Sequence, residues 1–126
     1  MQFLTLIHID PALLATLPQE EYDRLMRGCF EKADAFRDAG CLLGSQQLED
    51  PATARTLRVR EGLSRVTDGP FAETREFLAG FNLIEADSME AAMAIAREFP
   101  WARFGSIEVR PVRDMQCVRS RVGAPA

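Results

Sequence analysis

The sequence has little lysine, little histidine and no long apolar run. Lys32 is the single lysine among 15 basic residues, His8 is the single histidine, and the net charge is −4 with a pI near 5.0. Nucleic-acid-binding proteins usually gather unpaired basic residues on one face. Nucleic acid is therefore not expected as a partner. Because no run of about eighteen apolar residues occurs, a transmembrane helix is excluded and no membrane partner is expected.

Cysteine is also scarce, and the spacing of the three cysteines does not match that of a metal site. Cys29, Cys41 and Cys117 form no C-x-x-C pair, and no secretory signal precedes them, which favours the reducing cytoplasm. One histidine and scattered cysteines make no zinc site, and no glycine motif has the strand and helix context of a phosphate loop. The sequence therefore predicts a cytoplasmic protein without a metal or another cofactor.

The residues that are present predict one small domain with a single core, because 126 residues leave no room for a second one. Alternating and short apolar runs predict strands at Phe3–Ile7, Cys41–Ser45, Thr56–Arg60, Leu63–Thr67, Gly80–Ala86 and Ser106–Arg110. Apolar residues at intervals of three and four predict helices between Pro18 and Gly40 and between Asp87 and Pro100.

Several local signals set the predicted boundaries. Pro18 is expected at the first helical position and Gly40 as a left-handed cap. Asp87 and Glu90 form a plausible capping pair for the second helix. The first strand is apolar throughout, which predicts a central strand covered on both faces.

The clearest local motif is a β-hairpin. Two five-residue strands flank Glu61-Gly62, which is the loop length of a tight turn with a glycine available for a positive φ. In this register Leu57 and Val66 are predicted on the buried face, while Arg58 and Arg65 lie opposite each other on the other side.

In order, the elements predict an α+β fold with a ferredoxin-like plan and an inserted β-hairpin. Two helices on one face of a mainly antiparallel sheet leave the opposite face bare. Such a face usually finds a dimer partner or covers a ligand. The last residues, 113–126, show little pattern and are expected to be mobile or packed on a partner.

The segment from Val66 to Glu76, VTDGPFAETRE, continues into GFNLIEAD from Gly80 to Asp87. It resembles the motif of the DGPF group of YCII-related proteins, and the resemblance covers about residues 1–112. It implies a YCII-related domain at 1–112 with a separate tail, and a homodimeric α/β barrel in which two sheets pack face to face around a cavity.

The resemblance implies no settled activity. Some members occur beside or fused to extracytoplasmic-function sigma factors, and a His and Asp active-site pair is suggested for YCII relatives. By position the Asp of that pair falls near Asp38, and the His falls near Cys29, whereas His8 lies elsewhere.

The motif itself supplies the first candidate residues. Gly69 and Pro70 force a turn, and the carboxylate of Asp68 can accept hydrogen bonds from the amides that follow it. The turn is either purely structural or the rim of a pocket. Asp68, Glu73 and Glu76 can act as general acids or bases if one of them is buried, with Phe71 and Phe77 as apolar neighbours.

Basic residues supply the second set of candidate site residues. Arg58, Arg60 and Arg65 lie on one side of the hairpin, where they form either a salt-bridge network or a site for an anion. His8 ends the first strand and is the one side chain that titrates near neutrality without help.

Two functions follow as expectations. The first is a homodimer that binds a small polar or anionic organic molecule in a pocket between sheet and helices, with or without catalysis. Its catalytic candidates are Asp68, His8 and Asp38. Its ligand-binding candidates are Gly69, Pro70, Phe71, Glu73, Glu76, Phe77, Arg58 and Arg65. The alternative is a noncatalytic regulatory or interaction module linked to a sigma factor. A monooxygenase of the same barrel plan is a third reading, but no residue supports oxygen chemistry.

Overall fold

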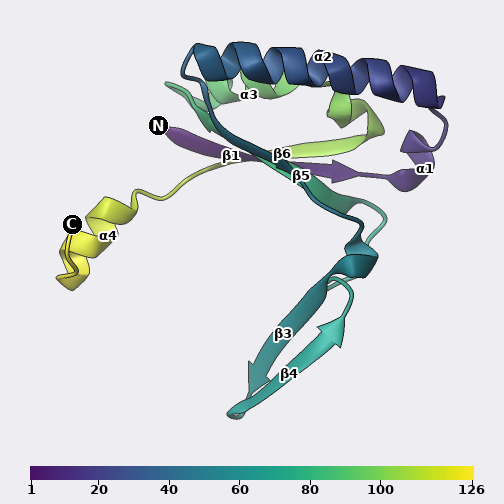
Figure 1. Ribbon diagram of the computed structural model, residues 1–126. Coiled ribbons are helices and arrows are strands. Elements are labelled where there is room, and N and C mark those ends of the chain that lie inside the picture. Colours follow the sequence, from purple (N-terminus) through teal and green to yellow (C-terminus); the bar gives the residue numbers. More distant parts are fainter.

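An antiparallel sheet with two helices on one face forms the body of the molecule (Figure 1). The computed structural model describes residues 1–126. The strands are β1 (Gln2–Ile9), β2 (Leu42–Gln47), β3 (Arg55–Arg60), β4 (Leu63–Asp68), β5 (Phe77–Glu85) and β6 (Gly105–Pro111). The helices are α1 (Pro11–Leu14), α2 (Gln19–Asp38), α3 (Met89–Arg97) and α4 (Met115–Val122), with 3₁₀ turns η1 (Pro51–Thr53) and η2 (Pro100–Phe104).

Four strands make the main sheet in the order β2-β5-β1-β6, and β3 and β4 pair only with each other. The α+β fold is confirmed, and the sheet of the single chain is open. The strand β1 is central, as predicted, but it is covered on one face only. Phe3 and Thr5, whose side chains face the helices, are 1% and 2% exposed, whereas Leu4 and Leu6 on the other face are half-buried.

Helix α2 forms as its sequence pattern predicts. Its first turn carries Glu20 and Glu21, which favour the positive end of the helix dipole. Pro18 is the N-cap rather than the first helical residue, and Gly40 takes a φ of 80°, the left-handed conformation that ends a helix. The range of α2 thus lies within the predicted boundaries.

Helix α3 starts one residue later than the predicted capping pair requires. The cap is Ser88, whose Oγ accepts a hydrogen bond from the backbone N–H of Ala91 at 3.1 Å. The prediction that Asp87 caps this helix is therefore wrong. Serine and aspartate are both good caps, so the sequence alone did not separate them.

The core lies between α3, the C-terminal half of α2 and the sheet. Its buried cluster comprises Phe3, Leu42, Ile84, Ala86 and Ala92. Ala33 and Phe36 of α2 pack against this cluster, and Phe36 meets Phe99 with 6.0 Å between ring centroids. The N-terminal half of α2 extends beyond this core.

The hairpin β3–β4 and helix α4 project away from the body (Figure 1). The predicted pairing of Leu57 with Val66 and of Arg58 with Arg65 is confirmed. The predicted burial is wrong, because Leu57 is 63% and Val66 is 59% exposed. Within one chain nothing packs against this side of the hairpin.

Four short elements were not predicted, namely α1, η1, η2 and α4. Helix α4 lies in the segment that showed little sequence pattern. It is held at its ends by Asp114, which caps its start, and by Gly123 with a φ of 74°. None of the helices is both long enough and apolar enough to cross a membrane.

Candidate functional site

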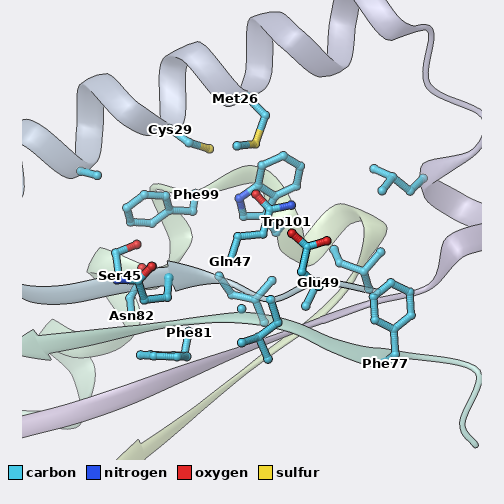
Figure 2. A pocket seen from close by; sticks show the side chains of 18 of the residues that line it. Met26, Cys29, Ser45, Gln47, Glu49, Phe77, Phe81, Asn82, Phe99 and Trp101 are labelled. Atoms are coloured by element: carbon cyan, nitrogen blue, oxygen red, sulfur yellow. The ribbon is translucent and has the colours of Figure 1, made fainter. Parts of the chain in front are cut away.

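A cavity of about 720 Å³ lies between the N-terminal half of α2 and the helix-covered face of the sheet (Figure 2). It is lined by 21 residues, and since 14 of them are hydrophobic, the lining favours a ligand with an apolar body. Aromatic residues in this lining include Tyr22, Phe30, Phe77, Phe99 and Trp101.

Helix α2 forms the roof of the cavity. Tyr22, Met26 and Cys29 follow one another at the spacing that keeps side chains on one helix face, and all three line the cavity. Figure 2 shows Met26 and Cys29 pointing from the helix toward the sheet. The same stripe continues into the core at Ala33 and Phe36. One apolar face therefore serves as core in its second half and as cavity roof in its first.

Trp101 forms a wall of the cavity. Pro100 ends the preceding segment and begins η2, which holds the indole ring near Tyr22, with 6.1 Å between ring centroids, and near Phe104 at 6.2 Å. Tilted aromatic pairs at this separation are mutually stabilising. Trp101 was not predicted as a site residue from the sequence.

Polar groups line the opposite side. Ser45 and Gln47 alternate along the edge strand β2, and Ser45 pairs in register with Asn82 of β5, which is 6% exposed. Glu49 and Asp50 follow β2 at the exposed rim of the cavity. The lining contains no arginine, lysine or histidine, so its charge is negative.

Cys29 lies near the position where the resemblance places a histidine. Burial raises the pKa of its thiol, and this effect is opposed by a side-chain hydrogen bond with Trp101 and by the charge of Lys32. The thiol is therefore protonated at neutral pH, because its ordinary pKa is already above 8. A neutral thiol cannot act there as a general base.

The DGPF segment lies mostly outside the cavity. Asp68 is the last residue of β4, with a side chain 92% exposed and 3.5 Å from Arg55. Phe71 is 79% exposed. Gly69, Pro70, Glu73 and Glu76 do not line the cavity either, and of the predicted ligand-binding residues only Phe77 does.

The hairpin arginines also lie away from the cavity. Arg58 donates from Nη2 to the carbonyl oxygen of Phe71 at 3.1 Å. No ion pair joins Arg58, Arg60 or Arg65 to a carboxylate, so the predicted salt-bridge network is absent. The like-charged pair of Arg58 and Arg65 instead faces solvent and the DGPF loop.

His8 lies on the uncovered face of the sheet. Ile7 and Ile9 line the cavity, so the alternating side chain of His8 points to the other face, 3.6 Å from Oε1 of Glu108. Its cross-strand partner Ser106 donates to Glu76 at 2.6 Å. The structure thus brings His8 and Glu76 to one end of the uncovered face. Asp38 ends α2 and joins neither group.

Asp10 is a buried acid that was not predicted as a site residue from the sequence. It is 4% exposed, caps α1 by accepting from the N–H of Ala12 at 3.0 Å, and binds Nε of Arg75 at 2.9 Å. The Asp10-Pro11 dipeptide was the available signal, since Asp before Pro favours a helix start. The ion pair ties the end of the DGPF segment to the body.

No group of three or more His, Cys, Asp or Glu side chains is placed to hold a metal ion. The cavity instead offers a ligand apolar surface, amide and hydroxyl groups that can form hydrogen bonds, and a negatively charged rim.

Two comparisons place the chain among known proteins. The model of the YCII-related domain family matches residues 1–116. An uncharacterized protein of Rhizobium meliloti (strain 1021) is 37% identical over 114 residues, which cover 89% of this chain and 92% of that protein. The family match includes all the residues that line the cavity and the whole hairpin. The chain belongs to the YCII-related domain family.

Proposed function

We propose that this protein binds a small organic molecule in the cavity between α2 and the sheet. The observation that supports this function best is the cavity itself, whose volume of about 720 Å³ lies in the range typical of small-molecule sites. Its apolar lining suits the body of a ligand. Ser45, Gln47 and Asn82 supply hydrogen bonds that fix its orientation.

The charges of the lining favour an uncharged or positively charged ligand over an anion. Glu49 and Asp50 lie at the rim, and no basic residue balances them. An ammonium group near this rim is attracted by the carboxylates and by the faces of Tyr22 and Trp101. A carboxylate ligand meets repulsion instead. Of the small polar or anionic molecules expected from the sequence, we therefore propose a polar one, an aromatic or aliphatic amine, and not an anion.

We also propose that the binding protein is a homodimer of the DGPF type, with two sheets packed face to face as a dimeric α/β barrel. The uncovered face of each sheet carries Leu4, Leu6 and Leu83, in which Leu4 and Leu83 are cross-strand partners. A second copy covers these side chains and releases the water that solvates them. Binding rather than catalysis is proposed, since the two carboxylates of the lining, Glu49 and Asp50, lie at its exposed rim.

The experiment uses Trp101 as a built-in reporter, because it is the single tryptophan and lines the cavity. Its fluorescence and the melting temperature are measured with pairs of aromatic ligands that share a skeleton and differ in an ammonium, alcohol or carboxylate group. We expect the ammonium compounds to bind best. At a concentration of about 100 Kd, ligand binding stabilises the fold by roughly 2.7 kcal/mol.

Charge variants make the test specific. Glu49→Gln is expected to weaken ammonium binding about two- to tenfold while leaving the alcohol unchanged, because it removes charge and keeps the shape of the side chain. Glu31→Gln, an exposed acid outside the cavity lining, serves as the matched control. If no compound changes the Trp101 emission or the melting temperature, the proposed function is wrong. If the carboxylate compounds bind most tightly, the proposal that the ligand carries a positive charge is wrong.

A further inference from the structure

The hairpin β3–β4 and helix α4 are folded elements that their own chain leaves uncovered. The two hairpin strands pair only with each other, and neither the hairpin nor α4 packs substantially against any other element. A two-stranded hairpin alone is marginally stable in water, and so is a helix of eight residues. Both elements therefore require contacts that a single chain does not supply.

The hairpin has two chemically different faces. Leu57, Val59 and Val66 share one face by register and are 63%, 55% and 59% exposed. On the opposite face, two residues of β3 contact the chain's own DGPF turn. There Thr56 donates to the carbonyl oxygen of Gly69 at 2.9 Å, and Arg58 donates to that of Phe71. The DGPF turn thus fixes the polar face, and the apolar face remains free.

Helix α4 repeats this pattern. Met115, Val118 and Val122 follow at helical spacing on one side, and Met115 and Val122 are 57% and 60% exposed. Its ends are capped within the chain, and Arg119 donates from Nε to the carbonyl oxygen of Pro125 at 2.6 Å. The apolar side of α4 has no partner in its own chain.

Both elements extend on the side of the sheet away from α2, which is the side of the uncovered sheet face (Figure 1). Their charges oppose that of the body. Residues 55–68 hold four arginines against two acids, and residues 113–126 hold three arginines against one acid, a net +2 each. Because the whole chain carries −4, the remaining residues carry −8. Basic arms on an acidic body are complementary to a second copy of the same chain.

We infer that the hairpin and α4 are arms that pack onto the body of a second copy, with Leu57, Val59 and Val66 on the hairpin as the anchoring contacts. This inference rests on the proposed homodimer and adds the surface that holds it together. In a twofold arrangement each copy gives two arms and receives two. The uncovered sheet face and the apolar sides of both arms are then buried together.

Hydrogen exchange of the unmodified protein provides the first test. Backbone amides of residues 55–68 are followed by mass spectrometry at concentrations above and below the dissociation constant measured by sedimentation equilibrium. An isolated hairpin opens readily and exchanges fast. We expect exchange in this segment to slow at least about tenfold in the dimer, with little change in the buried core strands. Equal exchange at all concentrations overturns the inference.

Substitutions provide the second test. Leu57→Ser with Val66→Ser removes the anchoring contacts on a surface that is exposed in the single chain, so the body is expected to stay folded by circular dichroism. We expect the dimer to weaken at least about tenfold, as the loss of buried Leu and Val side chains implies. Leu13→Ser, an apolar residue 44% exposed on α1, is the matched control and is expected to dimerise normally.

The outcomes separate this inference from the proposed function. If the wild type is a dimer and the double hairpin substitution leaves its stability unchanged, the inference about the arms is wrong. The proposed packing of the two sheets then still stands. A monomeric wild type overturns both the arms and the dimer, whereas binding in the cavity is still measured through Trp101. Weakened association with slowed exchange of residues 55–68 supports the arms.

Discussion

At the scale of single residues, two glycines differ sharply in what surrounds them. A Cβ placed on Gly105 comes within 2.0 Å of the backbone oxygen of His8, so the adjacent strand β1 has no room for it. A Cβ on Gly28 of α2 meets nothing within 4 Å. The first glycine is required by close packing of backbones, and the second is a dispensable weak point in a helix.

We therefore expect Gly105→Ala to destabilise the fold by about 3 kcal/mol, because β1 or β6 must shift to relieve the clash. Gly28→Ala is expected to stabilise it by about 0.5–1 kcal/mol, since alanine restricts the unfolded chain and favours the helix. Urea unfolding of both variants beside the wild type gives the two free energies. Equal effects of the same sign contradict the packing described here.

Cys117 on α4 offers a pH-dependent prediction. The neighbouring carboxylate of Asp114 accepts a hydrogen bond from its Sγ at 3.2 Å and, together with its negative charge, raises the pKa of the thiol. The thiolate is the form that reacts with alkylating reagents. At pH 8, below the raised pKa, little thiolate is present, and removing the carboxylate increases it.

Asp114→Asn is accordingly expected to speed alkylation of Cys117 severalfold at pH 8, and the difference is expected to vanish well above the thiol pKa. Asparagine is an equally good helix cap, so α4 is retained. Cys117 lies on the opposite side of α4 from Met115 and Val122, and it stays accessible in the proposed dimer. Mass spectrometry of peptides follows the rate, with Cys41 as internal control. Slower labelling of Cys117 in the variant contradicts this prediction.

At the scale of elements, local signals were sufficient for the sheet, both long helices and the hairpin. Glu61 and Gly62 set the turn by themselves, since both adopt a positive φ. What the sequence did not predict depends on contacts between distant segments. The apolar face of Leu57 and Val66 is indistinguishable in sequence from a core face, and only the fold shows that nothing in its own chain covers it.

The candidate site was harder to predict for the same reason. Its lining comes from α2, η2 and the strands β1, β2 and β5, and its apolar residues look like ordinary core positions in the sequence. Phe77 was predicted from its place near the DGPF motif, whereas Trp101 and Met26 were not. Where a helix overhangs its core, the first half of a uniform apolar stripe becomes cavity. Which half of the stripe lines the cavity depends on how far the helix extends past the sheet, and the periodicity of the sequence does not reveal that.

At the scale of the whole molecule, charge is divided between body and arms. Arms of net +2 and a body of −8 attract each other between two copies, and most of these charges lie at the surface, where salt screens them. Hydrophobic contacts between the sheets respond little to moderate salt. The proposed dimer therefore combines an apolar attraction that persists in salt with an electrostatic one that does not.

Raising the salt from about 0.05 M to about 0.5 M is expected to increase the dissociation constant of the dimer roughly three- to tenfold, measured by sedimentation equilibrium. Arg60→Gln on the hairpin removes part of the attraction, so it weakens the dimer at low salt and flattens the salt dependence. Arg97→Gln on α3 makes the body more acidic, and it is expected to leave the dimer as strong or stronger. If both variants weaken association equally, or if salt tightens it, the arms are not held by the acidic body.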